Sequence, residues 1–379
     1  MSLQGIKTIA VLELRQRLRT SRWLIVVGIW FLIIGAVAGL TWWAVNDQPG
    51  DRGTTLYDVV LFFVLGLGML VVPSLTATSI NGDREHGVLA TMQTTLLTPA
   101  DIVIGKLASS WVISLAFLLA ASPFLVWAWI AGGVEIGRML LAVAVLVFVL
   151  AVVCALGLMF STLTARTIAS AVLTYLSVAA LTFGTVIAFL LSMPILSTEA
   201  SVRVKVVPDS FFQSQPANPD GTNVPGPTPA EPTPADCVYV NREQTILHTE
   251  RTWWLLALNP FVVVADAAPS RKPLPYIGFE PLQLISDGAR TARMGVTPDS
   301  LNECWPEFAV ASLESQPGAG VGVDNGGQEQ LRRDRLNKVH AVWPYGFVFL
   351  GVLGAMSTWV AVRRLRTPIR RLPRGTRIA

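Results

Sequence analysis

Six long apolar segments constrain this chain more than any other feature. Each is long enough to cross the hydrocarbon core of a membrane as a helix, which takes roughly 20 residues. Asp58, near one segment end, is the only Asp, Glu, Lys, Arg or His inside them. Because lipid offers the backbone no water to hydrogen-bond, such segments should be helical. The sequence therefore predicts an all-α membrane protein with six transmembrane helices, at about 23–45, 57–80, 107–131, 139–163, 168–194 and 342–362.

The composition excludes an ordinary soluble protein, since 52% of the residues are hydrophobic and only 14% are charged. The expected organisation is an amphipathic helix on the cytoplasmic face, five transmembrane helices with a cytoplasmic loop, a large extracytoplasmic insertion that contains a Pro-rich linker, a sixth transmembrane helix and a basic tail. These parts correspond to 1–22, 23–194 with the loop 81–106, 195–341 with the linker 216–235, 342–362 and 363–379.

Lys and Arg residues are distributed unequally over the connections between the apolar segments. The N-terminal segment carries five, and seven arginines follow residue 362, whereas Arg52 and Arg138 are the only ones in the short connections of the other side. Positively charged loops remain in the cytoplasm, and long loops cross the membrane largely regardless of charge. The distribution predicts a multi-pass protein of the plasma membrane with both termini in the cytoplasm.

The first 22 residues contain apolar side chains at helical spacing among basic ones. This pattern predicts a helix that lies on the inner leaflet, or one that merely satisfies the charge rule for cytoplasmic segments. The basic tail is expected to contact anionic lipid. The apolar row consists of Leu3, Ile6, Ala10, Leu14 and Leu18.

The extracytoplasmic insertion begins with Ser201–Val207, whose alternating polar and apolar side chains predict a strand. The apolar stretch Thr252–Ala268 is short and interrupted by Asn259-Pro260, so we expect it to be interfacial or re-entrant. Cys237 and Cys304 both belong to the insertion, where an oxidising compartment permits a disulfide. They are candidate partners, with two unpaired thiols as the alternative.

The loop 81–106 is the only sizeable connection on the cytoplasmic side. Its glycines can interrupt a helix, Val88–Leu97 can form a short amphipathic one, and Pro99 would end it. Charged side chains are available for a partner, and the alternative is a solvated connector. Lys106 would then be a residue that reaches the interface along its aliphatic stem. The candidate partner-binding residues are Asp83, Arg84, Glu85, Gly87, Leu89, Leu97 and Pro99.

This loop resembles the signature loop of the type-2 ATP-binding-cassette export permeases. There an acidic residue, a glycine and a leucine precede a Thr-Pro turn and a Gly-Lys entry into the third span, and the matching residues here are Glu85, Gly87, Leu89, Leu97-Thr98-Pro99, Ile102 and Gly105-Lys106. The resemblance implies a coupling helix that docks on an ATP-binding subunit. It also implies a pair of permeases, here most simply a homodimer, and ATP with Mg²⁺ bound by the partner subunit.

The chain lacks the motifs of a catalyst of its own. Gly105-Lys106 has no upstream glycine at the spacing of a phosphate-binding loop, and the three histidines lie far apart. We therefore expect no catalytic residue, no metal site, no cofactor in this chain and no nucleic-acid partner. A membrane enzyme that uses Glu280, Asp287 or Glu303 has no motif to support it.

The shortage of ionisable groups in the spans argues against an ion-coupled carrier and favours an apolar or amphipathic cargo. Small and polar side chains in the second and fifth segments are candidates for a cargo pathway or a dimer seam, and ordinary helix packing is the alternative. They are Ser74, Thr78, Thr174, Ser177 and Thr185. The predicted function is a transport permease that exports its cargo. The alternative is a membrane-anchored sensor or binding protein that acts through the extracytoplasmic insertion.

Overall fold

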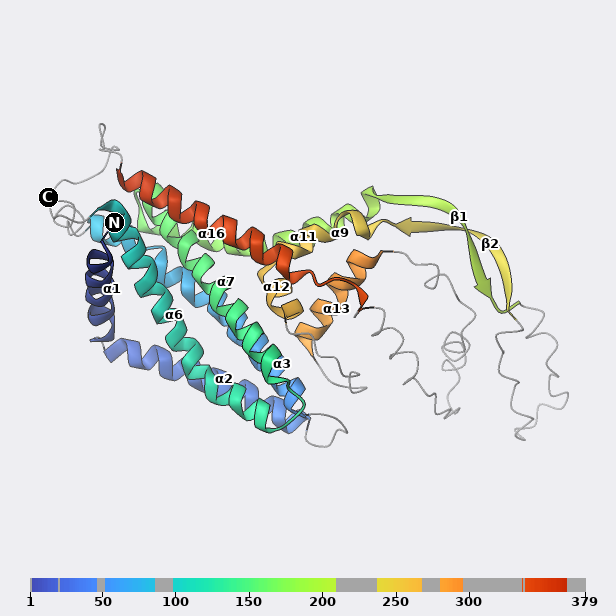
Figure 1. Ribbon diagram of the computed structural model, residues 1–379, viewed down its shortest axis with the longest axis horizontal. Helices are drawn as coiled ribbons and strands as arrows, with labels where there is room; N and C mark the ends of the chain where they lie inside the picture. The colour runs from blue at the N-terminus through green and yellow to red at the C-terminus, as the bar shows by residue number, and fades with distance from the viewer. Residues whose placement is uncertain are drawn as a thin grey trace.

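A computed structural model describes residues 2–19, 21–45, 52–85, 98–208, 237–267, 280–295, 336 and 338–366. Within them, six helices are long and apolar enough to cross a membrane, which confirms the predicted fold class. The helices form an elongated bundle (Figure 1). They are α2 (Ser21–Ala44), α3 (Arg52–Thr76) with its short continuation α4 (Ser79–Glu85), α6 (Pro99–Ile130), α7 (Ile136–Leu163), α8 (Thr167–Ala179) with α9 (Thr185–Ile195), and α16 (Trp343–Arg366).

Two of these helices begin earlier than their hydropathy suggested. The second span starts at Arg52 rather than near residue 57, and the third starts at Pro99 rather than near residue 107. The additional residues at the start of both helices include polar side chains. Prediction from hydropathy therefore began both helices too far along the sequence. The added residues include Thr55 in α3 and Lys106 in α6, whose partners are described below.

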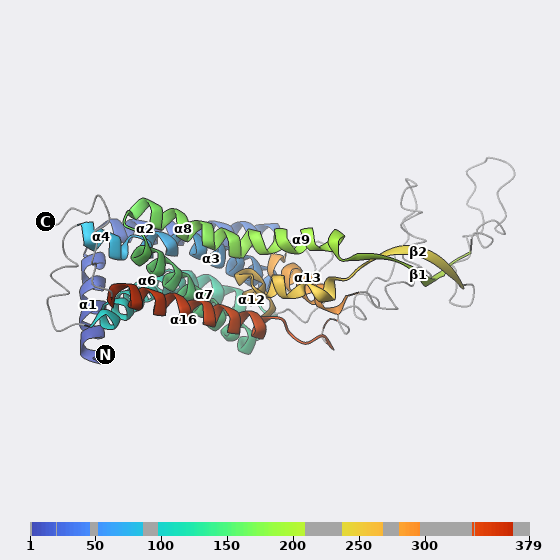
Figure 2. The same ribbon diagram turned by 90° about the horizontal axis from the view of Figure 1, so that it is seen from above.

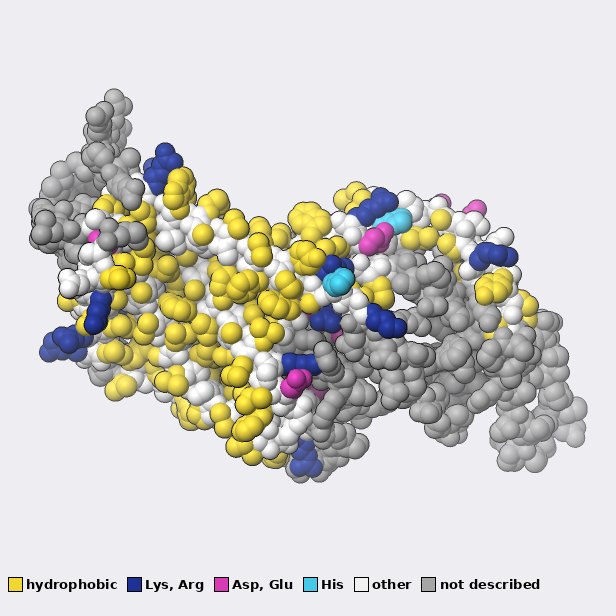
Figure 3. Space-filling view, in the orientation of Figure 1, with side chains coloured by type: hydrophobic (Ala, Val, Ile, Leu, Met, Phe, Trp, Pro, Cys, Tyr) yellow, Lys and Arg dark blue, Asp and Glu magenta, His cyan; other side chains and the backbone are white. Residues whose placement is uncertain are grey.

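Burial separates the inner helices from the outer ones. In the most apolar window of α3 and of α7, 56% of the residues are buried, compared with 17% for α2 and 22% for α16. The outer helices therefore expose large apolar side chains, which cover the visible face of the bundle between its two ends (Figure 3). Such a surface suits a helix bundle surrounded by lipid.

The helix α1 (Leu3–Leu18) runs across one end of the bundle, which we call the basal end (Figure 2). Its Gly5, Ile9 and Glu13 are buried. The predicted apolar row is divided, because Leu14 packs against the core whereas Leu3 and Leu18 are exposed. The helix therefore has a protein-facing side in addition to any surface that it offers to lipid.

The opposite end, which we call the distal end, carries a two-stranded ribbon and short helices (Figure 1). The predicted strand overlaps the second half of β1 (Ser197–Val206), which pairs in antiparallel register with β2 (Val238–Leu247). The predicted interfacial or re-entrant stretch forms α11 (Trp253–Ala257) and α12 (Pro260–Ala267), both too short to span a membrane. Helix α13 (Pro281–Met294) packs beside α12. The linker 216–235 lies outside the described residues.

The fifth span contains a π turn, Ala180–Gly184, between α8 and α9. Asn259, in the distal segment before α12, supplies a hydrogen-bond donor to this turn. Its Nδ2 donates to the carbonyl of Thr182 at 2.6 Å and to Oγ1 of Thr185 at 3.1 Å. The Oδ1 atom of Asn259 accepts from the backbone N–H of Phe261 at 2.9 Å. One amide thus joins the π turn to the start of α12.

Helices α3 and α7 cross closely at Gly157. A Cβ atom there would overlap Oγ1 of Thr76 and lie 2.8 Å from its Cβ. We expect Gly157→Ala to lower the free energy of unfolding by about 1–3 kcal/mol, because the packed helices would have to separate. Thermal unfolding in detergent measures this. Adding Thr76→Gly should recover part of the loss, and equal stability of Gly157→Ala and the wild type would contradict the close crossing.

Candidate functional site

The two ends of the loop 81–106 lie at the basal end of the bundle. Its first residues form the end of α4, and its last residues form the start of α6. Residues 86–97 lie outside the described residues, and with them Gly87, Leu89 and Leu97 of the predicted partner-binding set. What the structure describes is the anchorage of the loop at both ends.

A capping box begins α6. Oδ2 of Asp101 accepts from the backbone N–H of Thr98 at 3.0 Å and from its hydroxyl at 2.7 Å, and Oγ1 of Thr98 accepts from the N–H of Asp101 at 3.3 Å. Pro99 follows the cap in the first turn, where its missing N–H costs nothing. Pro99 therefore starts the third span, in addition to any effect that it has on the residues before it.

Lys106 is fully buried and lies between two carboxylates. Its Nζ is 2.6 Å from Oδ2 of Asp83 in α4 and 3.2 Å from Oε1 of Glu13 in α1, and it donates to the carbonyl of Ser79 at 3.2 Å. Arg17, one turn further along α1, lies 3.7 Å from Glu13. This geometry argues against the alternative that Lys106 extends to the membrane interface, because its charge is paired inside the protein.

Helix α1 is fastened to the end of the loop at α6 and to the end of α3. At its start, the N–H of Ser2 donates to Oδ1 of Asp101 at 3.0 Å. In its middle, Ile9 packs so closely on α6 that a Cβ atom on Gly105 would lie 2.8 Å from the Ile9 Cβ. Near its end, Arg17 donates to the carbonyl of Leu75 in α3 at 3.0 Å. Helices α1, α4 and α6 are therefore held together as one unit.

The start of the loop is also fixed to the turn between α7 and α8. Oγ of Ser161 accepts from the N–H groups of Ile80 and Asn81 at 3.0 and 3.1 Å, and Nδ2 of Asn81 donates to Oγ1 of Thr164 at 3.1 Å. These contacts fix the first turn of α4, which leads into the undescribed part of the loop.

The predicted charged residues of the loop differ in what they offer a partner. Glu85 is exposed, whereas Arg84 is half-buried and donates to the carbonyl of Thr164 at 3.5 Å. Asp83 is half-buried and its carboxylate pairs with Lys106. Of the three, Glu85 has the side chain most accessible to another protein.

The predicted pathway residues do not share one surface. Ser74 is exposed on α3 and Thr78 in the turn between α3 and α4. Thr174 and Thr185 are buried in the fifth span, and Ser177 is half-buried there. The buried hydroxyls donate to carbonyls of their own helix, Thr174 to Ser170 and Thr185 to Leu181. Their burial agrees with helix packing, the alternative that the sequence left open.

Sequence reasoning missed Glu13 and Asp101. Glu13 was visible as the one acidic residue of the basic N-terminal segment, and the order Thr-Pro-x-Asp over 98–101 is a capping signal. What it did not show was that Glu13 pairs with Lys106 and that Asp101 also accepts from the N–H of Ser2, so that both residues join α1 to the start of α6.

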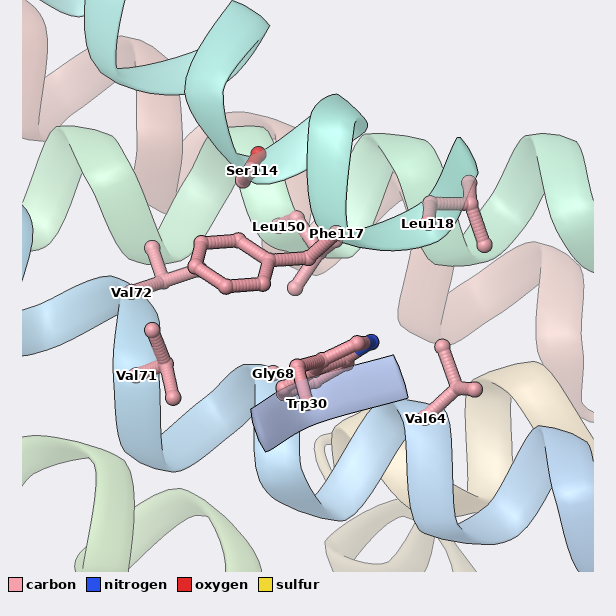
Figure 4. Close-up of a pocket in the computed structure, with 9 residues that line it drawn as sticks. All are labelled: Trp30, Val64, Gly68, Val71, Val72, Ser114, Phe117, Leu118 and Leu150. Carbon is pink, nitrogen blue, oxygen red and sulfur yellow. The ribbon is translucent and has the colours of Figure 1, made fainter. Parts of the chain in front are cut away.

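A small apolar cavity lies between α2, α3, α6 and α7 (Figure 4). Trp30, Phe117 and Leu150 are among the residues that line it, and its volume of about 10 Å³ is near the size of one water molecule. It is too small for a transported molecule. No group of three potential metal ligands occurs among the described residues.

The cysteines are only partly described. Cys154 is a buried free thiol in α7, and Cys237 is disulfide-bonded. Cys304 lies outside the described residues. Its pairing with Cys237 stays a prediction.

A family model described as ABC-2 type transporter matches residues 4–200, which include all of α1 except Leu3, the first five spans and the loop 81–106. No curated protein matches the chain.

Proposed function

The chain belongs to the ABC-2 type transporter family, and from this membership we propose that it is the permease subunit of an ATP-driven exporter. Permeases of this family generally work with an ATP-binding-cassette subunit and are not catalytic themselves. ATP and Mg²⁺ would accordingly be bound by the partner. The chain would move an apolar or amphipathic cargo outward, as one of two permease copies.

We assign the basal end to the cytoplasm. Lys7 and Arg15 of α1 and Arg166 of the turn before α8 are exposed there, whereas the short distal connections contribute Arg52 and Arg138. The bias follows the rule that short positively charged loops stay inside. Helix α16 ends at the basal end, so this orientation leaves the C-terminal segment in the cytoplasm as well (Figure 1).

The anchorage of the loop at the basal end carries the proposal. Lys106 joins α4 to α1 and α6 through two short charge contacts, and Glu85 ends the described part of α4 in an exposed position. A partner that moves the loop would therefore move α3, which leads into α4, and α6 together. Such a contiguous, hydrogen-bonded unit is suited to carry motion from an ATP-binding subunit into the membrane.

The cargo path would form where two permease copies meet. The cavity between α2, α3, α6 and α7 holds about 10 Å³, too little for a cargo. Ser74 of α3 and Thr78 of the turn that follows it are exposed at the surface. Tyr175 of α8 lies beside this face, since its hydroxyl donates to the carbonyl of Leu70 at 2.9 Å. We infer that this surface meets the second copy or the cargo.

Charge reversal at Glu85 tests the coupling role. We expect Glu85→Lys to insert normally but to lower the ATPase that co-purifies with the tagged chain by about tenfold, which corresponds to ~1.4 kcal/mol of binding. The measurement is mild-detergent affinity purification from the native host, with the partner and its ATPase rate quantified per permease. Unchanged recovery and rate would remove Glu85 from the interface.

Glu199→Lys is the matched control, because Glu199 is exposed on β1 at the opposite end of the molecule. It should leave the recovered ATPase unchanged. Purification of the wild-type chain without any ATP-binding subunit would contradict the exporter and favour the alternative, a sensor that acts through the distal insertion.

A further inference from the structure

Helix α3 holds the start of α13 at the distal end. The carboxylate of Asp58 accepts from the backbone N–H groups of Leu282 at 2.8 Å and Gln283 at 3.2 Å, and Oγ1 of Thr55 donates to Oε1 of Glu280 at 3.0 Å. The first N–H groups of a helix have no partner within it and need an external acceptor. Here the acceptor comes from another helix 224 residues earlier in the sequence. We call these five residues the distal latch.

On its other side, α13 is fastened to α12 and α16 by Asp266. Oδ1 of this carboxylate accepts from Nε of Arg290 at 2.6 Å and from the hydroxyl of Ser286 at 3.0 Å. Oδ2 accepts from the N–H groups of Val342 at 2.5 Å and Trp343 at 2.9 Å. Helices α12 and α13 and the first turn of α16 thus form one body, which we call the distal cap.

The two joints differ in how costly they are to open. Separating Asp266 from Arg290 would leave a buried charge unpaired, because Asp266 is 1% and Arg290 7% exposed. Asp58 is also buried, at 9% exposed, but its carboxylate accepts from neutral backbone N–H groups rather than from a cation, so opening this joint separates no such ion pair. The distal latch is therefore the weaker of the two joints. It is the contact that we expect to break when the distal cap separates from the helix bundle.

Helix α3 also links the distal latch to the basal site. Thr55 and Asp58 lie in its first two turns, while Leu75 accepts from Arg17 near its end and Asp83 of α4 pairs with Lys106. A displacement of α4 therefore pulls on the helix whose far end holds α13. The two sites share one mechanical element.

We propose that the distal latch is the outer gate of the transporter: it is closed in this structure and opens, by movement of α3 away from α13, when the partner binds ATP. The inference rests on the proposed function and adds the moving joint to it. Helix α13 lies outside residues 4–200, the part that the family model matches. The gate is thus supplied by the chain's own distal insertion.

Cysteines across the joint test the gate. In the complex with its ATP-binding subunit, reconstituted in lipid nanodiscs, Thr55→Cys/Glu280→Cys should form a disulfide readily without nucleotide. After trapping with ATP and vanadate, we expect its formation to be at least about fivefold slower. The control pair is Thr198→Cys/Ile246→Cys, whose residues lie opposite each other in the ribbon and should react alike in both states.

Equal rates for Thr55→Cys/Glu280→Cys in both states would overturn the gate. A second measurement does not depend on a disulfide: spin labels on the exposed Leu70 of α3 and Leu284 of α13 should change their separation on trapping. An unchanged distance distribution would also overturn it. The ATPase rate of the wild-type complex is measured first, so that loss of the exporter hypothesis is distinguished from loss of the gate alone.

Discussion

Lys106→Met should lower the free energy of unfolding by about 3–5 kcal/mol, because it removes the buried cation between Asp83 and Glu13 and leaves Glu13 with the more distant Arg17. Lys106 is 0% exposed, and Glu13 and Asp83 lie within 3.2 and 2.6 Å of its Nζ. Methionine preserves the apolar stem of the side chain, so the loss reports on charge rather than on volume. Thermal unfolding of the purified protein in detergent measures it.

Two variants control this result. Lys7→Met removes a cation from an exposed position of the same helix α1 and should change stability little. Lys106→Met combined with Glu13→Gln and Asp83→Asn removes all three charges and should recover much of the loss. A Lys106→Met protein as stable as Lys7→Met would show that the buried charge group does not hold the basal end together.

The second large effect is expected at the distal end. Asp266→Ala should lower the free energy of unfolding by about 3–5 kcal/mol, because it strands the buried guanidinium of Arg290 and two backbone N–H groups at the start of α16. Thermal unfolding measures the loss. Proteolysis of the distal insertion should become faster in the same variant, since the cap would lose its common acceptor.

Glu135→Ala provides the comparison for Asp266→Ala. Glu135 also pairs with an arginine, Arg138 at 2.8 Å, but its side chain is 67% exposed. Exposed ion pairs contribute about 0–1 kcal/mol, so this variant should be nearly as stable as the wild type. If both variants lost the same amount, burial of the Asp266 pair would not be what stabilises the cap.

Hydrophobicity was sufficient to locate the membrane helices but not their polar ends. The start of α6 was missed because the side chains from Pro99 to Lys106 include charges that a hydropathy scale excludes from a span. Asp101 closes a capping box and Lys106 is paired, so both are compatible with helix. The capping box at Asp101 can be predicted from the local sequence. The pairing of Lys106 cannot, because it depends on which carboxylates the fold brings close to it.

The distal elements show where sequence patterns become ambiguous. The alternation around Ser201–Val207 predicted β1. Its partner strand Val238–Leu247 was not predicted, because its mixture of charged and apolar residues is recognisable as a strand only from its pairing with β1. Glu280 lacked any motif and turned out to lie at the start of α13. The break at Asn259-Pro260 was visible, while the π turn that Asn259 satisfies was not.

The sequence by itself determined the membrane environment, the number of spans and the resemblance of the loop 81–106 to a transporter family, because these depend on local composition and spacing. Only the tertiary structure decided that Lys106 meets Glu13, 93 residues away, and that Asp58 caps a helix 224 residues away. A buried charge is stable only beside its partner, and packing chooses that partner among residues that the sequence leaves far apart.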